Sequence, residues 1–315
     1  MTAMQVVVLS KVGWHADELC RALGERGHCG RVLPYESLVA RFTGDGDAAL
    51  TGNRLAILDA DAVLARFIPA GSLEQIIYRV DALHWIEEHG VPVMNSPRAI
   101  ERSVDKFYTD ARLREAGLST LETVVCEGAA EALTAIRAML AEPQANPVGD
   151  AVVIKPIFGS MGHGIVRVSD PDVAFRVLQP LERIGAVFYV QRAVDSGGRD
   201  VRVFVVGGRV LGAIERRAPD GDWRANVSRG GSARSIELPA AWADLAIRAA
   251  AAVGADYAGV DLLPCRDGCV FVLEVNGIPG WQGLQAATGI DVAGSIVDHL
   301  VERVESGRSA DVVRA

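Results

Sequence analysis

Short apolar runs alternate with longer amphipathic runs along the chain up to about residue 95. The run from Gln5 to Ser10 is typical of a buried parallel strand, and the amphipathic run that follows it stops at Gly27, as helices commonly do. This alternation predicts an open α/β subdomain over residues 1–95. Its expected strands are 5–10, 55–58 and 91–94, and its expected helices are 17–26 and 72–89.

A different pattern begins at Ser96-Pro97. Serine is a favoured N-cap and proline fits the first helical position, so a helix carrying Asp105 and Lys106 is predicted from there to Gly117. After a loop at 142–149 that is rich in Pro, Gly and Asn, short β-rich runs dominate. We expect strands at 152–155, 166–168, 187–193, 201–206, 210–216, 259–263 and 270–276, helices at 240–253 and 292–304, and a frayed tail after Ser306.

Composition narrows the class of function. The 315 residues include 32 Lys+Arg against 40 Asp+Glu, and the net charge of -8 argues against sequence-independent binding of nucleic acid. The five cysteines form no CxxC pair and no His-linked spacing, which argues against a disulfide framework or a zinc site. No apolar stretch approaches the roughly 18 residues of a membrane span, and the opening apolar run is too short for a signal peptide. A cytoplasmic protein without membrane or nucleic-acid partners is expected.

Residues 258–276 have the most informative spacing. Asp267-Gly268 between two apolar runs predicts a two-residue hairpin turn. Counting back along both strands places Asp261 opposite Glu274, and Asn276 points to the same face as Glu274.

Two opposed carboxylates repel each other, so we expect the pKa of one of them to be raised. A divalent cation removes this conflict, and oxygen donors without His or Cys favour Mg²⁺ or Mn²⁺. The alternative is a pair of exposed carboxylates on the rim of the sheet.

A glycine-rich loop follows the apolar strand expected at 152–155. Gly159, Gly162 and Gly164 let backbone amides approach an anion closely, whereas the lack of Gly-Lys-Ser/Thr and of a following helix excludes a P-loop. Lys155 ends the strand, where an unpaired ammonium group is costly to bury, so phosphate is its expected partner. A bare turn is the alternative for the loop, and for Lys106 alone the default is a solvated helix position.

The segment 199–234 is basic within an acidic chain, because eight arginines stand against four acidic residues. Guanidinium groups bind carboxylates and phosphates in planar bidentate geometry, and the segment contains no lysine. Gly207-Gly208 predicts a hairpin that gathers several of these charges. The segment is expected to bind an anionic substrate, and the alternative is a solvated basic face.

Several motifs together resemble the ATP-grasp ligases of the RimK type, a family that contains α-L-glutamate ligases. In chain order they are Asp105-Lys106, Val153-Ile-Lys-Pro156, the Gly-Ser-Met-Gly-His-Gly of 159–164, Ala213-Ile-Glu-Arg-Arg-Ala218, Arg224-Ala-Asn226 with Arg229-Gly-Gly231, and Leu273-Glu-Val-Asn276. Three N-terminal stretches resemble, more particularly, ATP-grasp proteins associated with tetrahydromethanopterin-linked one-carbon metabolism in methylotrophic bacteria. These stretches are Gly13-Trp-His15, Pro69–Gln75 and Ile100-Glu-Arg102.

The resemblance implies an α/β protein with the ATP-grasp fold over residues 96–315, preceded by an N-terminal α/β (pre-ATP-grasp) domain over 1–95. About 120–193 would form the small subdomain that covers the nucleotide, and about 194–305 the subdomain that binds metal and substrate. The implied cofactors are ATP and Mg²⁺ or Mn²⁺, with two ions.

The resemblance also assigns roles to single residues. Lys106 and Lys155 would contact ATP phosphates beneath the loop of Gly159, Ser160, Gly162 and Gly164. The adenine hinge would be Gln191, Arg192, Ala193 and Val194, and because the family often has Glu where this chain has Arg192, backbone groups are left to bind adenine. Asp200 would hold the ribose, Arg224 and Asn226 would lie near phosphate and metal, Arg202, Arg216 and Arg224 would be catalytic, and Asp261, Glu274 and Asn276 would bind metal.

The implied reaction joins a carboxylate to an amine. The carboxylate attacks the γ-phosphorus of ATP, and an amine then displaces phosphate from the acyl phosphate. The resemblance implies L-glutamate as the amine, and a C1 carrier of the tetrahydromethanopterin or methylofuran type is a candidate acceptor. The alternatives are another amide or dipeptide ligase and a non-catalytic ATP-binding protein. The sequence is compatible with a homo-oligomer and leaves the oligomeric state open.

Overall fold

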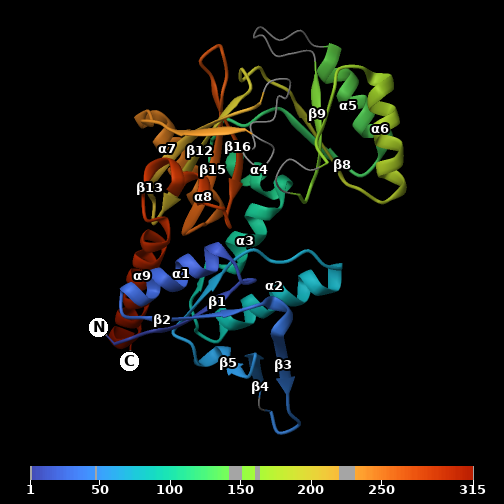
Figure 1. The fold of residues 1–315 in the computed structure, drawn as a ribbon. Coiled ribbons are helices and arrows are strands. Elements are labelled where there is room, and N and C mark those ends of the chain that lie inside the picture. Colours follow the sequence, from blue (N-terminus) through green and yellow to red (C-terminus); the bar gives the residue numbers. More distant parts are fainter. Residues whose placement is uncertain (1, 47, 142–150, 160–163, 220–230, 315) are drawn as a thin grey trace.

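The computed structural model describes residues 2–46, 48–141, 151–159, 164–219 and 231–314. The described residues form four β-sheets, which Figure 1 shows as a lower N-terminal lobe and two upper sheets on either side of a central helical connection. None of the described helices is long and apolar enough to cross a membrane.

The lower lobe is built on a parallel sheet in the order β2-β1-β6-β7, as the alternating pattern predicts. Its strands are β1 (Gln5–Leu9), β2 (Cys29–Leu33), β6 (Ala62–Ala65) and β7 (Val93–Met94), and its helices are α1 (Trp14–Glu25) and α2 (Leu73–Glu88). The expected strand at 55–58 is wrong, because those residues form the short strand β5 (Leu55–Ala56) and most of a 3₁₀ turn. The third parallel strand is instead β6, whose four residues are all buried.

A small antiparallel sheet extends below this lobe (Figure 1). It consists of β3 (Leu38–Phe42), β4 (Ala48–Gly52) and β5. The sequence pattern does not predict it.

The expected helix from Ser96 to Gly117 is two helices, α3 (Pro97–Val104) and α4 (Lys106–Glu115). Ser96 caps α3 with Pro97 at its start, as predicted. Asp105 adopts an extended conformation, and its carboxylate accepts a hydrogen bond from the Tyr108 N–H at 3.1 Å. An aspartate that can cap a second helix therefore breaks the first one and makes Lys106 the opening residue of α4.

One upper sheet is antiparallel, in the order β10-β9-β11-β8. Its strands are β8 (Thr123–Cys126), β9 (Val152–Pro156), β10 (Val166–Val168) and β11 (Phe188–Arg192). Helices α5 (Ala129–Ala141) and α6 (Pro171–Arg183) cover one face of it, and both are absent from the sequence-based expectation. Asp170 followed by Pro171 was the missed signal for α6, because the Asp170 carboxylate caps its N-terminus. The loop expected at 142–149 lies outside the described residues.

The second upper sheet has the order β14-β13-β12-β15-β16. Its strands are β12 (Arg199–Val206), β13 (Arg209–Arg217), β14 (Ser232–Ser235), β15 (Tyr257–Pro264) and β16 (Val270–Asn276). The hairpin predicted at Gly207-Gly208 is confirmed, and both glycines have the positive φ that a tight turn requires, 55° and 71°. Helix α7 (Ala240–Val253) packs on one face, so the opposite face is available to line a cleft.

The chain returns to the lower lobe through α8 (Gln282–Thr288) and α9 (Val292–Arg314), and α9 lies beside α1 (Figure 1). Arg21 on α1 pairs with Asp291 just before α9 at 2.8 Å. Helix α9 continues to Arg314, beyond Ser306, where the sequence predicts a frayed tail. One hydrophobic core joins residues of β1 and α1 to residues of β12 and α9, which ties the lower lobe to the five-stranded sheet.

Candidate active site

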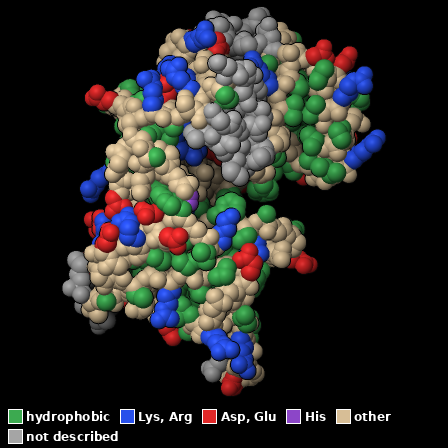
Figure 2. Space-filling model, viewed as in Figure 1, with side chains coloured by type: hydrophobic (Ala, Val, Ile, Leu, Met, Phe, Trp, Pro, Cys, Tyr) green, Lys and Arg blue, Asp and Glu red, His purple; other side chains and the backbone are tan. Residues whose placement is uncertain are grey.

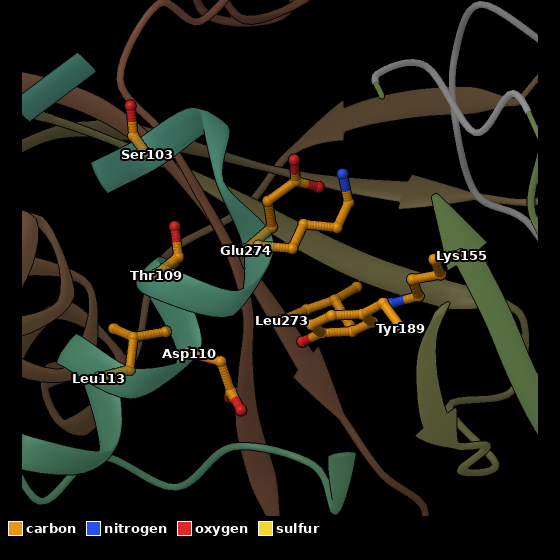
Figure 3. A pocket seen from close by; sticks show the side chains of 9 residues that line it. Ser103, Thr109, Asp110, Leu113, Lys155, Tyr189, Leu273 and Glu274 are labelled. Carbon is orange, nitrogen blue, oxygen red and sulfur yellow. The ribbon is translucent and has the colours of Figure 1, made fainter. Parts of the chain in front are cut away.

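A cleft lies between the two upper sheets, and α3 and α4 contribute part of its lining. Figure 2 shows the surface of the molecule in the orientation of Figure 1, and Figure 3 shows the side chains that line the cleft. The lining residues come from α3, α4, β9, β11 and β16. They are Ser103, Lys106, Thr109, Asp110, Leu113, Lys155, Tyr189, Leu273 and Glu274. Lys106, Lys155 and Glu274 are therefore brought together, although they lie far apart in the sequence.

Lys155 lies on β9 with its ammonium group inside the cleft. Its Nζ donates a hydrogen bond to Gln191 Oε1 at 2.6 Å, and the ring of Tyr189 is 5.9 Å away. Burial is the main reason that the pKa of Lys155 is lowered to about 8; Glu274 opposes this change, and the charge of Lys106 adds to it. A buried ammonium group with one neutral partner is well suited to bind an anion.

Lys106 connects α4 to the start of the glycine-rich loop. Its Nζ donates to the carbonyl oxygens of Gly159 at 2.9 Å and Ile157 at 3.4 Å. Gly164 has a φ of 73°, which favours glycine. Both lysines thus lie where the loop begins, whereas Ser160 and Gly162 lie outside the described residues.

Two neighbouring side chains of the expected adenine hinge, Gln191 and Arg192, point to opposite faces of the sheet. Gln191 faces the cleft, where its amide accepts from Lys155 and donates to Thr123 Oγ1 at 3.0 Å. Arg192 points to the opposite, helix-covered face, and its guanidinium donates to Glu122 at 2.6 Å and to the Met139 carbonyl. The structure therefore gives the Arg192 side chain no adenine-binding position.

The hinge backbone is also partly engaged. The Ala193 N–H donates to the Ala151 carbonyl at 3.0 Å, and the Arg192 N–H donates to the Glu122 carbonyl at 2.9 Å. Val194 follows β11 and is half-buried. Adenine binding by other backbone groups of this hinge remains a prediction.

The predicted pairing of Asp261 with Glu274 is confirmed, but the turn that leads to it is not the predicted one. The Cys265 N–H bonds to the Cys269 carbonyl, so the loop has three residues rather than two. This shifts the pairing by one residue, and a β-bulge at Leu273 shifts it back before Glu274. Two local departures from the simple count cancel.

The predicted repulsion between these carboxylates is wrong, because arginines surround Asp261. Arg202 donates to both Asp261 oxygens at 2.7 Å, and Arg216 donates to one of them at 2.9 Å. Burial by itself would raise the pKa of Asp261, but the two guanidinium charges outweigh it and lower the pKa to about 2. Asp261 is therefore fully ionised and neutralised within the protein.

Asp200 belongs to the same charged group. Arg216 donates to its two carboxylate oxygens at 2.6 and 2.8 Å. Burial raises the pKa of Asp200, and Arg216 opposes this change. The structure gives Asp200 an arginine partner, and its expected contact with ribose remains a prediction.

The expected metal ligands fit a hard cation by donor type. Glu274 lines the cleft directly opposite Asp261, and the Asn276 side-chain oxygen, which accepts from the Ile278 N–H at 3.0 Å, adds a third oxygen. Among the described residues no three His, Cys, Asp or Glu side chains lie together so that they could hold a metal ion, and the expected set has only two carboxylates and one amide oxygen. This open set suits Mg²⁺ or Mn²⁺, which take remaining ligands from phosphates and water.

Two expected site residues are not described by the structure, and two residues of the cleft were not predicted. Arg224 and Asn226 lie outside the described residues. Tyr189 and Asp110 line the cleft but were missed by the sequence reasoning. Two patterns could have found them, because Tyr189 shares the face of β11 with Gln191, and Asp110 follows Lys106 by one helical turn.

The two upper sheets enclose a cleft lined by lysines, and carboxylates and arginines lie on the sheet face beside it. This arrangement is that of an ATP-dependent ligase of the ATP-grasp class. A model of the RimK-like ATP-grasp domain matches residues 104–300, which include every cleft-lining residue but Ser103. The chain belongs to the RimK-like ATP-grasp family, whose members form amide bonds and release ADP.

Relatives match almost the whole chain. A tetrahydromethanopterin:α-L-glutamate ligase of Methanosarcina acetivorans is 32% identical over 95% of this chain and 99% of its own length. A probable α-L-glutamate ligase of Trichodesmium erythraeum is 34% identical over 98% and 99%.

Solved structures share the fold. The ATP-grasp ligase PsnB, complexed with a minimal precursor, Mg and ADP, has a TM-score of 0.70 at 24% identity and matches over 96% of this chain and 98% of its own. D-cycloserine synthetase DcsG also has a TM-score of 0.70, at 22% identity, over 95% and 99%. The ATP-grasp fold predicted from the motifs is therefore confirmed.

Proposed function

We propose that this protein uses ATP to join the amino group of L-glutamate to a carboxylate acceptor. The observation that carries the proposal is the cleft itself, which Lys106, Lys155 and Glu274 line together. Glu274 is paired across the strands with Asp261, which Arg202 and Arg216 contact. Lysines suit the phosphates of a nucleotide, and arginines suit planar carboxylate and phosphoryl groups. The two kinds of anion in the reaction thus have separate cationic partners.

Mg²⁺ or Mn²⁺ accompanies the nucleotide in this proposal, and Glu274, Asp261 and Asn276 would hold it. Supporting this assignment, PsnB was solved with Mg and ADP. A bound divalent ion would neutralise charge on the β- and γ-phosphates. Two ions are part of the proposal because the open oxygen set leaves positions for phosphate ligands.

The protein side chains contribute positioning and charge. Lys155, held by Gln191 at 2.6 Å, is placed to move its ammonium group onto a phosphate oxygen. Arg202 and Arg216 are placed to orient the acceptor carboxylate as its oxygen attacks the γ-phosphorus and ADP leaves. The same guanidinium groups then stabilise the oxyanion as the glutamate nitrogen attacks the acyl carbon and phosphate departs.

The choice of substrates rests on relatives. The names of both relatives include α-L-glutamate, and one also includes tetrahydromethanopterin. We therefore place L-glutamate as the amine and a C1 carrier of the tetrahydromethanopterin or methylofuran type as the acceptor. Another amide or dipeptide ligase activity is the competing reading, because the cleft residues suit any carboxylate and amine.

Phosphate and ADP release in the presence of Mg-ATP tests the proposal. Purified protein is incubated with each amino acid and with pterin- or furan-type carboxylate acceptors, and the product mass is determined. We expect release to require glutamate and an acceptor together, with a mass gain of one glutamyl group. Equal stimulation by alanine would assign the chain to dipeptide or other amide ligases. Tight ATP binding without turnover on any pair would assign it to non-catalytic ATP-binding proteins.

A further inference from the structure

Four charged side chains form one continuous group on the face of the five-stranded sheet opposite α7. Asp200 and Arg202 are two residues apart on β12 and so point to the same side. Their cross-strand partners are Arg216 on β13 and Asp261 on β15. We name these four residues the arginine–aspartate ladder.

Three of the four ladder residues are buried, and the two arginines and two aspartates are neutral together. Asp200, Arg216 and Asp261 are 7%, 5% and 4% exposed. Each carboxylate accepts a bidentate pair of hydrogen bonds, Asp261 from Arg202 and Asp200 from Arg216. Arg216 also reaches Asp261 at 2.9 Å, so Asp261 is shared between two guanidinium groups.

Any cation that coordinates Asp261 meets the two guanidinium groups that already contact this carboxylate. A divalent ion that binds an Asp261 oxygen competes with Arg202 and Arg216 for the same negative charge and repels both guanidinium groups, so these contacts are weakened when the ion binds. A buried guanidinium group that loses its carboxylate needs another anion, since an unpaired buried charge is costly. The phosphoryl oxygens of a nucleotide are an anion of the right geometry.

We propose that Asp261 is exchanged between the two arginines and the divalent cation, and that the arginines move to the phosphoryl group when the cation arrives. Cation and phosphoryl anion then strengthen each other's binding through Asp261. Asp200 is a positioning residue that keeps Arg216 on the cleft side of the sheet. This inference rests on the proposed function and assigns the coupling between its two cofactors.

The first test measures Mn²⁺ binding to the nucleotide-free protein by electron paramagnetic resonance. Arg202→Gln should bind Mn²⁺ at least about tenfold more tightly than the wild type, because the guanidinium that occupies both Asp261 oxygens is gone. Arg199→Gln is the matched control: Arg199 lies on the same strand but points to the other face, where it pairs with Glu215 at 3.5 Å. Its Mn²⁺ affinity should equal that of the wild type.

Arg202→Lys distinguishes the effect of the bidentate hydrogen bonds to Asp261 from the effect of the positive charge alone. Lysine keeps the positive charge but cannot donate to both oxygens in the planar geometry of arginine. Exchange predicts Mn²⁺ affinity between those of the wild type and Arg202→Gln. Unchanged affinity in both Arg202 variants, with melting curves showing folded protein, would overturn the proposal.

A thermodynamic cycle tests the movement onto phosphate. The non-hydrolysable nucleotide AMPPNP should tighten Mn²⁺ binding in all proteins, since its phosphates bind the ion directly. The enhancement should be smaller in Arg202→Gln than in the wild type and Arg199→Gln, because that variant has lost the bidentate Arg202 contact and has only the Arg216 contact left to exchange. An equal enhancement in the three proteins would show that the arginines do not move to the nucleotide.

Asp200→Asn tests the positioning role against the ribose role. Without the Asp200 charge, Asp261 is the remaining carboxylate partner of Arg216 and holds it more strongly. Mn²⁺ should therefore bind several-fold more weakly than to the wild type, whereas Arg202→Gln should bind it more tightly. A ribose ligand predicts instead that the mutation removes any preference for ATP over 2′-deoxy- and 3′-deoxy-ATP. Loss of that preference with unchanged Mn²⁺ affinity would overturn the positioning role. Substrate-dependent ADP release by the wild type tests the proposed function separately, so either idea can fail without the other.

Discussion

Replacing Lys155 with methionine should make the ligand-free protein more stable and the nucleotide complex weaker. Burial lowers the pKa of Lys155 from 10.5 to about 8, so keeping the amine charged in the folded protein at pH 7 costs roughly 3 kcal/mol. Methionine has a similar length and no charge. The Gln191 oxygen that accepts from Lys155 then loses its donor, which offsets about 1 kcal/mol, and a gain of about 2 kcal/mol remains.

Nucleotide binding should change in the opposite direction. A hydrogen bond from a charged donor to phosphate contributes about 1.5–3 kcal/mol, so the methionine variant should bind Mg-ATP roughly 10- to 150-fold more weakly. Isothermal titration calorimetry measures the affinity, and chemical denaturation measures the free energy of unfolding. Lys11→Met is the matched control, because Lys11 is exposed and does not line the cleft. It should leave both quantities unchanged.

The stability difference should depend on pH in a defined window. Between about pH 8 and 10.5 the unfolded chain still holds the Lys155 proton that the folded protein has released. The wild type therefore gains stability as pH rises through this window, and its deficit relative to Lys155→Met shrinks. A variant that is less stable at pH 7, or that binds Mg-ATP with wild-type affinity, would refute the placement of a charged Lys155 in a phosphate site.

Three further perturbations test the rest of the structure. Glu274→Gln should abolish ADP-forming turnover and the thermal stabilisation by Mg-ATP, while the ligand-free melting temperature stays within a few degrees; near-normal turnover would remove Glu274 from the metal site. Asn95→Ala should cost about 2–4 kcal/mol in chemical denaturation, because the amide bonds four backbone groups of Asp256, Tyr257 and Gly277; a cost below 1 kcal/mol would contradict this. Burial holds the pKa of His15 near 4, so stability should fall as pH drops from 6.5 to 4, and less so in His15→Gln; equal slopes would contradict the assignment.

Local sequence signals predicted those parts of the fold that depend on local geometry. Gly207-Gly208 predicted its hairpin correctly because two positive φ angles are needed there and glycine supplies them. The break at Asp105 was missed although its cause is also local, since an aspartate inside a helical pattern can serve as a cap. The opposition of Asp261 and Glu274 came out correctly only because a longer loop and a bulge cancel, and the amino-acid pattern alone specifies neither.

The arginines around Asp261 could not be predicted in the same way. Their contacts depend on the strand order β13-β12-β15, which brings Arg216, Arg202 and Asp261 side by side from three separate strands. A count along the β15-β16 hairpin sees only two carboxylates and therefore predicts repulsion. Arg202 on the neighbouring strand and Arg216 on the next one place positive charge beside Asp261. The pKa of Asp261 is therefore lowered, whereas repulsion between two carboxylates would raise a pKa.

The charges that the structure places in and beside the cleft balance without any ligand. Lys106 and Lys155 face Glu274 and Asp110 in the cleft, and in the arginine–aspartate ladder each arginine has a carboxylate partner. A polyanionic nucleotide that enters alone would therefore find no excess of positive charge among the described residues. A nucleotide that carries divalent cations brings its own compensation, and the cations free the arginines of the ladder as they bind Asp261. Dependence of nucleotide affinity on the cation thus follows from the neutrality of the ligand-free site as well as from direct coordination.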